Sequence, residues 1–371
     1  MTNITGTQQG QSPSCVLPGV IMCLLSATAI ALVLGYVFVA SSTGEIGLLR
    51  YGGAGYYSDR HLLFAVSGIT LAFFAARYFS QLVSGARPLF ILAGTWALLL
   101  LPLFFEPVAG GYSWVRFGGL AFQPSAFAGP ALILFLSVDL AKKREEHGVN
   151  AYISPILAVS VTFLLLGLAG RAAAMIVVFS TAFIMAVAGG LRKRDVAGII
   201  SLMGATVIVE LLRFPYRFSR MAAFYSSPTE GGYQTAVSKS FLASGGLLGN
   251  VASINMGKLP EFYSNFGFSG LVADQGWLAA LLVVVVLGMI LYRAVRIAQR
   301  SAARTEKLLA GGIAFYLGLM VLLHLLKCFG IVPPNDIPLP LISYGGSELL
   351  SSMFLIGILF GIGKRRIHYA G

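Results

Sequence analysis

The sequence predicts an all-α integral membrane protein of about ten transmembrane helices. Of its 371 residues, 57% are hydrophobic and 11% are charged, whereas a typical soluble domain has roughly 25% charged residues. The mean hydropathy is +0.82. A helix needs about 20 mostly apolar residues to cross the hydrocarbon core of a bilayer, and about ten blocks of the chain approach that length. We therefore expect one polytopic membrane domain over residues 1–371.

The expected spans are separated by short polar or basic connections. The fifth and sixth are predicted to form a tight hairpin with Gly170 and Arg171 at its tip. In chain order the expected spans are 19–40, 61–82, 88–105, 122–141, 152–169, 172–190, 195–213, 277–296, 308–331 and 345–363.

Basic residues predict the orientation. Lys and Arg concentrate in one alternating set of connections, including 142–144, 192–194 and 293–307, and in the tail at 364–366. Because cytoplasmic loops carry the excess of Lys and Arg, both termini are predicted to be cytoplasmic. The largest non-spanning segment, about 214–276, then lies outside, between the seventh and eighth helices. The net charge of +12 is explained by topology and a lipid bilayer, and no nucleic-acid partner is expected.

A proline-rich stretch precedes the last span and reads PPNDIPLPLISYGGSELL. Proline removes a backbone donor and glycine permits unusual dihedral angles, so this stretch is predicted to be non-helical. Non-helical backbone at membrane depth is tolerated where it is buried in protein or lines a water-filled cavity. We therefore expect a cavity wall here, with a purely structural kink as the alternative.

Several motifs resemble one family in the same order along the chain. IPLPLISYGGSELL is similar to the TG-x-PLPF-ISYGGSS pattern of the SEDS proteins (shape, elongation, division and sporulation), the group of FtsW and RodA. FQPS at 122–125 resembles the family's fQPSE element, and residues 216–249 resemble its YR-x-x-R…GYQ…GG-x-x-G stretch. LPEFYSNFGF at 259–268 resembles LPE-x-HTDFIF. The resemblance covers essentially the whole chain.

The resemblance implies a role in peptidoglycan synthesis during cell division or in cell shape. Such proteins polymerise lipid II, an undecaprenyl-pyrophosphate-linked sugar, at the outer face of the bacterial cytoplasmic membrane, with a class B penicillin-binding protein as partner. The reaction displaces undecaprenyl pyrophosphate with inversion at the anomeric carbon. The departing pyrophosphate needs cations, and a divalent metal is compatible with that need. No cofactor is certain, and the sequence assigns no metal ligands.

The position of the family's general base carries an amide. The aspartate of LPE-x-HTDF corresponds to Asn265, and an amide oxygen accepts hydrogen bonds but has no useful basicity. In QPSE-x-x-K the acid and base correspond to Ala126 and Gly129, and the acid of PDLGT corresponds to Arg171. These departures predict weak or no glycan polymerisation and leave open whether the protein is an enzyme.

Two other carboxylates are candidates for the missing base. Asp274, near the outer end of the eighth span, is ranked first, and Glu261, four residues before Asn265, is ranked second. The ranking is provisional because proton transfer depends on geometry before pKa.

Other candidates for substrate binding lie in the outer segment and the proline-rich stretch. Arg217 and Arg220 could clamp pyrophosphate, because guanidinium groups suit phosphate oxygens, or could anchor at the membrane interface. Tyr233 and Gln234 could contact sugar or pack the segment. The remaining candidates, expected to shape the cavity wall, are Ser343, Tyr344, Gly345 and Gly346.

Ionisable residues within the spans need partners, because intramembrane charges usually pair. His324 and Lys327, three residues apart, are expected to face Glu348 of the next span. For the whole protein, two alternatives to a polymerase remain. One is a non-catalytic scaffold or flippase-like partner of a penicillin-binding protein, and the other is an unrelated secondary transporter.

Overall fold

The apolar blocks form helices in the computed structural model, because an α-helix satisfies its own backbone polar groups within hydrocarbon. The structure describes residues 17–107, 111–117, 120–143, 153–190, 232–250 and 261–369, with a few single positions between 197 and 224. The helices in chain order are α1 (Leu17–Tyr51), α2 (Tyr56–Arg77), α3 (Phe79–Leu82), α4 (Arg87–Leu100), η2 (Leu101–Phe104), η3 (Pro124–Phe127), α5 (Ala128–Lys143), α6 (Ile153–Leu168), α7 (Ala172–Ala188), α10 (Tyr233–Ser244), α11 (Gly267–Arg300), α12 (Arg304–Cys328) and α13 (Gly346–Tyr369).

The predicted all-α membrane fold is confirmed. Among the described residues, seven helices are long and apolar enough to cross a membrane, and α6 and α7 are shorter apolar helices. Every expected span coincides with these helices except 195–213, which lies largely outside the described residues. The total of about ten spans therefore stays a prediction.

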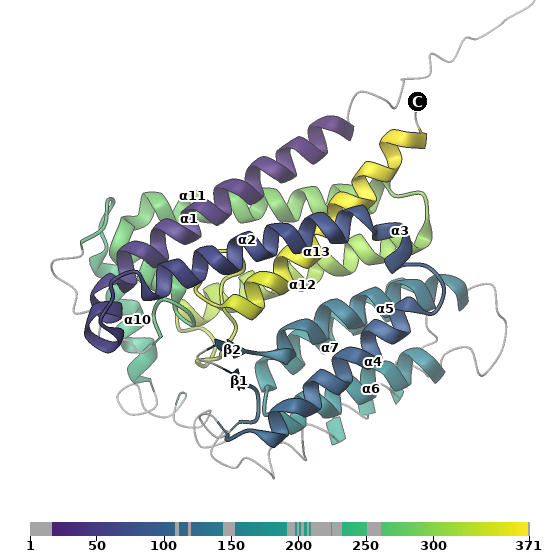
Figure 1. Ribbon diagram of the computed structural model, residues 1–371, viewed down its shortest axis with the longest axis horizontal. Helices are drawn as coiled ribbons and strands as arrows, with labels where there is room; N and C mark the ends of the chain where they lie inside the picture. The colour runs from purple at the N-terminus through teal and green to yellow at the C-terminus, as the bar shows by residue number, and fades with distance from the viewer. Residues whose placement is uncertain are drawn as a thin grey trace, which may run out of the picture.

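The helices run side by side in one bundle (Figure 1). One group contains α1, α2, α11 and α13, with α13 packed along α2 and α1 along α11. A second group contains α4, α5, α6 and α7. Helix α12 contacts α11 on one side and α5 and α7 on the other, so it joins the two groups. The start of α1 and the end of α13 lie at the same end of the bundle.

The outer segment is partly helical. It contains α10, and α11 begins at Gly267, well before the span expected from 277. The predicted boundary nevertheless coincides with a break inside α11, where Gly276 has φ 85° and ψ 176°. Only glycine adopts this conformation readily, and a Cβ at this position would overlap the backbone of residues 247–249. A short antiparallel hairpin, β1 (Val115–Phe117) and β2 (Leu120–Phe122), lies just before η3.

Candidate functional site

The segment that carries Asn265 folds as a turn leading into α11. Glu261 has a positive φ of 55°, and its carbonyl oxygen accepts the N–H groups of Ser264 (3.0 Å) and Asn265 (2.9 Å). Phe262 and Phe266 are each 1% exposed and anchor the turn in the apolar core. The side chains of Glu261 and Asn265 meet, and Nδ2 of Asn265 donates to Oε2 of Glu261.

The charges around this pair act on Glu261. Burial and then the negative charge of Asp336 raise the pKa of the Glu261 carboxyl above its ordinary value, and Lys327 opposes them. A raised pKa makes a carboxylate a better proton acceptor near neutral pH. The Asn265 amide holds the carboxylate in place. The Asn265 amide therefore orients a neighbouring acid.

Two side chains of α12 hold the proline-rich segment. Its non-helical carbonyl groups need donors, and Nζ of Lys327 donates to the carbonyl oxygens of Asn335 (2.9 Å) and Ile337 (2.8 Å). Nε2 of His324 accepts the N–H of Phe268 (3.2 Å), while Nδ1 contacts the Ile337 carbonyl oxygen (2.9 Å). Because Nε2 accepts, the ring proton belongs on Nδ1. These contacts tie the segment to α12 and to the start of α11.

The predicted pairing of Lys327 and His324 with Glu348 is therefore wrong. Nearby backbone carbonyl groups satisfy Lys327, and Glu348 lies 3.9 Å from Nη2 of Arg171 instead. Nη1 of Arg171 contacts the Asp336 carboxylate. Arg171 is buried at the tip of the hairpin between α6 and α7, so its two contacts connect that hairpin to the proline-rich segment and to α13.

The residues expected in the cavity wall connect the proline-rich segment to the turn before α11. Ser343 Oγ accepts a backbone N–H from four residues earlier (3.0 Å). The N–H of Tyr344 donates to the carbonyl oxygen of Tyr263 (2.9 Å), so the two segments lie side by side. Burial raises the pKa of the Tyr344 hydroxyl to about 12. Gly345 and Gly346 lead directly into α13.

A tyrosine cluster beside these segments was not predicted from the sequence. Tyr51 and Tyr56 stack with ring centroids 3.7 Å apart. Tyr57 lies 4.9 Å from Tyr263 and 5.2 Å from Tyr344. The hydroxyl of Tyr263 donates to that of Tyr57 (3.3 Å). The only sequence signal was the YGGAGYY run at 51–57, between the first two spans. Tyrosine combines an apolar face with a polar end, so the cluster is an amphipathic surface at the site.

The structure places Asp274 apart from the pair formed by Glu261 and Asn265. Asp274 is 7% exposed and lies in α11 before the break at Gly276. Ser41 of α1 donates to its carboxylate. This contact makes Asp274 a link between α11 and α1.

The remaining predicted residues are less informative. Tyr233 and Gln234 form the first turn of α10, and Tyr233 is 51% exposed. Arg217 and Arg220 lie outside the described residues. Within the described parts of the chain, no group of three or more His, Cys, Asp or Glu residues could hold a metal ion.

Comparison with known proteins identifies the family. The model of the FtsW, RodA and SpoVE family, described as cell cycle proteins, matches residues 22–368. The chain belongs to this family. A probable peptidoglycan glycosyltransferase FtsW of Coxiella burnetii is 28% identical, with 92% of this chain and 95% of that protein covered. A probable peptidoglycan glycosyltransferase FtsW of Geobacter metallireducens is 29% identical, with 93% and 94% covered.

Solved structures share the fold. A peptidoglycan synthase complex, described as coordinating polymerization and crosslinking, contains a chain that matches with a TM-score of 0.72 and 23% identity, covering 92% of this chain and 97% of that one. RodA of Thermus thermophilus matches with a TM-score of 0.66 and 22% identity, covering 92% and 96%.

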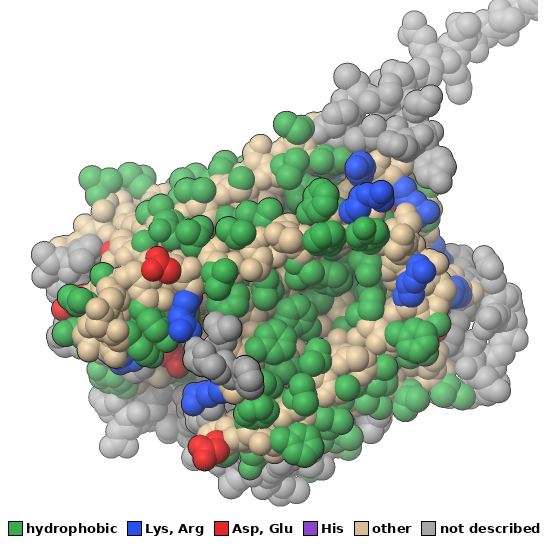
Figure 2. Space-filling view, viewed as in Figure 1, with side chains coloured by type: hydrophobic (Ala, Val, Ile, Leu, Met, Phe, Trp, Pro, Cys, Tyr) green, Lys and Arg blue, Asp and Glu red, His purple; other side chains and the backbone are tan. Residues whose placement is uncertain are grey.

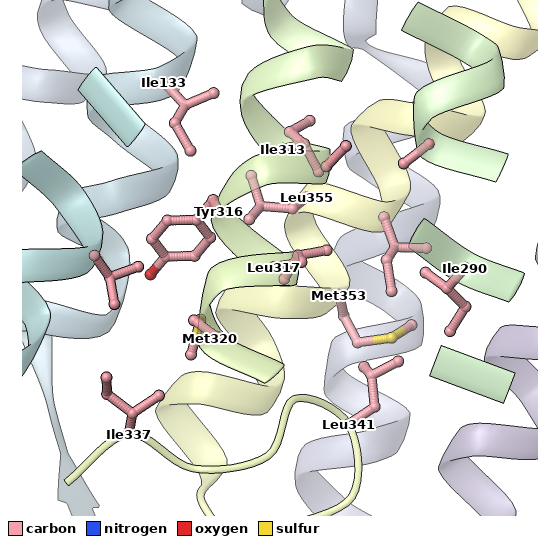
Figure 3. Packing of buried hydrophobic residues seen from close by; sticks show 14 of the residues in the cluster. Ile133, Ile290, Ile313, Tyr316, Leu317, Met320, Ile337, Leu341, Met353 and Leu355 are labelled. Atoms are coloured by element: carbon pink, nitrogen blue, oxygen red, sulfur yellow. The ribbon is translucent and has the colours of Figure 1, made fainter. Parts of the chain in front are cut away.

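Four departures from the family's sequence pattern meet in one place. By the resemblance, Ala126 and Gly129 stand where QPSE-x-x-K has its acid and base, Arg171 where PDLGT has its acid, and Glu348 where ISYGGSS has its last serine. A side chain at Gly129 would overlap the ring of Tyr316, which lies in the packed interior around α12 (Figure 3). Arg171 at the start of α7 and Glu348 of α13 form a charged pair in this part of the bundle.

Buried polar atoms occur in the pair formed by Arg171 and Glu348 and in the residues at the start of η3. Four of them have no hydrogen-bond partner among the described residues: Nε2 of Gln123, Oγ of Ser125, Nε of Arg171 and Oε2 of Glu348. Gln123 is also connected to α13, because its backbone N–H donates to Oγ of Ser347 (2.8 Å). Unpaired buried polar atoms are costly, so these four atoms are candidates for further hydrogen bonds.

Proposed function

We propose that the chain is a SEDS-type protein of peptidoglycan synthesis that binds lipid II at the outer face of the bacterial inner membrane and polymerises it weakly or not at all. Family membership and relatives named as probable peptidoglycan glycosyltransferases support the pathway. The hydrogen bond from Asn265 to Glu261 carries the proposal for turnover, because the usual base position holds an amide.

The residual reaction assigned to Glu261 is a single displacement. A sugar hydroxyl of lipid II attacks the anomeric carbon of the growing glycan, and its proton passes to the Glu261 carboxylate. The bond from that carbon to the pyrophosphate oxygen breaks, and undecaprenyl pyrophosphate leaves with inversion. A positioned base contributes about 10²–10⁴-fold to the reaction rate. A base that lies away from the family's usual position therefore gives a slow reaction. Asp274 is the second candidate for the same role.

The residues around Glu261 and the nearby surface of the bundle suit both the headgroup and the lipid tail of lipid II. Hydrophobic side chains cover the recessed surface between α2 and α4 (Figure 2), where the lipid tail would lie. The tyrosine cluster and the unpaired atoms of Gln123 and Ser125 offer contacts to sugar. Arg217 and Arg220, with or without a divalent metal, are assigned to the pyrophosphate by their motif alone.

The proposed partner is a class B penicillin-binding protein. A chain of the same fold occurs in the peptidoglycan synthase complex, which supports assembly with a crosslinking enzyme. The pattern of Lys and Arg supports both termini lying in the cytoplasm, with the site at the outer face.

Glycan polymerisation from purified lipid II tests the proposed base. We expect little polymer from the wild type, at least about tenfold more from Asn265→Asp, and less than the wild type from Glu261→Gln. Asp274→Asn tests the second candidate: it should stay at the wild-type rate if Glu261 is the base, and a lower rate would transfer the role to Asp274. Abundant polymer from the wild type, unaffected by Glu261→Gln, would overturn the assignment.

A non-catalytic scaffold or a lipid flippase is the second candidate function, favoured by the same amide at the base position. Binding assays separate a scaffold from a protein that handles lipid at this site. A scaffold should capture its penicillin-binding protein unchanged after Arg217→Ala and Arg220→Ala. A lipid-binding protein should lose affinity for lipid II in those variants.

A further inference from the structure

The end of the bundle that holds both chain ends contains a cleft unrelated to the lipid II site. It lies where α1 begins and where α11 and α13 end. Its lining is almost entirely apolar: Val20, Ile21 and Ile362 form the floor, and Arg296 and Arg300 line it with the apolar stems of their side chains, so that their charged ends form the rim. Figure 2 shows Lys and Arg side chains gathered at this end of the molecule.

The two rim arginines form a local excess of positive charge. They are four residues apart on α11, so they share one face of the helix, and both are half-buried. Arg296 lies 5.8 Å from the ring of Tyr292. Among the described residues, no carboxylate forms an ion pair with either arginine.

Other arginines at this end are already engaged. Arg304 donates to the carbonyl oxygen of Gly189 (2.7 Å), and Arg365 contacts Glu306 (3.5 Å). The sequence offers little further neutralisation, because residues 1–44, 275–305 and 349–371 contain no Asp or Glu. The rim is therefore free to take an anion from outside the chain.

We propose that this cleft binds the headgroup of an anionic phospholipid. Guanidinium groups donate in a fork that matches phosphate oxygens, and the apolar floor would lie along the upper part of an acyl chain. Basic pockets between transmembrane helices bind anionic headgroups by the same combination. A free phosphate would use the rim alone, whereas a zwitterionic lipid adds no net negative charge to offset the two guanidinium groups.

The test measures the thermal unfolding midpoint of the full chain in neutral detergent as phosphatidylglycerol is added. We expect a saturable increase for the wild type and an about tenfold higher half-saturating lipid concentration for Arg296→Gln with Arg300→Gln, since a charge-assisted contact is worth about 1.5 kcal/mol or more. Arg293→Gln with Lys307→Gln removes the same charge at the same end without touching the cleft, and should behave as the wild type does.

Three results would overturn the proposal. Equal weakening in both double variants would indicate general surface attraction, an equal increase with phosphatidylcholine would indicate filling by any lipid, and an equal increase with inorganic phosphate would indicate an anion site. Mass spectrometry of co-purified lipid gives a second measurement that does not depend on stability. The cleft variant should lose bound phosphatidylglycerol and the control should retain it.

Discussion

Replacing Arg171 by an apolar residue is expected to destabilise the bundle. Its guanidinium group pairs with Glu348 at 3.9 Å and also contacts Asp336. Arg171→Met keeps the apolar stem of the side chain and removes only its charge. Glu348, with a side chain only 13% exposed, is then left without its counter-ion.

The expected loss in the free energy of unfolding follows from how exposed the two partners of Arg171 are. Breaking a buried ion pair by removing one partner costs about 3–5 kcal/mol. The side chain of Asp336 is 39% exposed, so water screens its contact with Arg171, which contributes only about 0–1 kcal/mol to stability. The long distance to Glu348 favours the lower limit of the buried range. We therefore expect a loss of about 3 kcal/mol for Arg171→Met, and recovery of about 1–2 kcal/mol when Glu348→Gln is added.

Reversible unfolding in mixed micelles, with increasing dodecyl sulfate and tryptophan fluorescence as the signal, measures these differences. Arg87→Met is the matched control, because Arg87 makes an exposed contact with the carbonyl oxygen of Gln81, and its loss should cost less than about 1 kcal/mol. If Arg171→Met were as stable as this control, or if adding Glu348→Gln destabilised it further, the ion-pair reasoning would be refuted.

Substitutions at three positions test other parts of the site. The pKa of the Glu261 carboxyl is raised above 4.5 in the folded protein. The contribution of this carboxyl to stability is therefore present below pH 4.5 and is lost as the pH rises through the folded pKa. Glu261→Gln should therefore gain thermal stability relative to the wild type between pH 4 and pH 8. Gly276→Ala should cost about 1–3 kcal/mol or more in the same micelle assay, because φ is positive there, and a wild-type midpoint would contradict this. His324→Asn should keep most of the stability, while His324→Leu should lose about 1–3 kcal/mol by leaving the buried N–H of Phe268 unpaired; equal losses would show that hydrogen bonding is not its role.

Local patterns of hydropathy predicted most of the fold, because each transmembrane helix must form the hydrogen bonds of its own backbone polar groups. Span length and hydropathy placed the described helices, and the boundary expected at 276 fell on the break at Gly276. The pattern did not predict that helical structure would continue from Gly267 to that break, because this stretch contains small and polar residues. It also did not predict α10.

The partners of the charged residues could not be predicted from spacing. His324, Lys327 and Glu348 were expected to pair, but Lys327 donates to carbonyl groups that the proline-rich segment leaves free. Glu348 meets Arg171, which lies far away in the sequence. Spacing along a helix identifies which residues share a face, whereas the partner of that face depends on how distant helices pack.

The sequence by itself determined the membrane fold, the family resemblance and the presence of Asn265 at the position that the resemblance aligns with a base. Each of these is a local property of composition or motif. Only the tertiary structure decided that Asn265 holds Glu261 and that Asp274 faces α1. It also decided that Arg171 and Glu348, which come from separate parts of the sequence, meet. Such contacts depend on the mutual placement of distant segments, which hydrophobic periodicity does not specify.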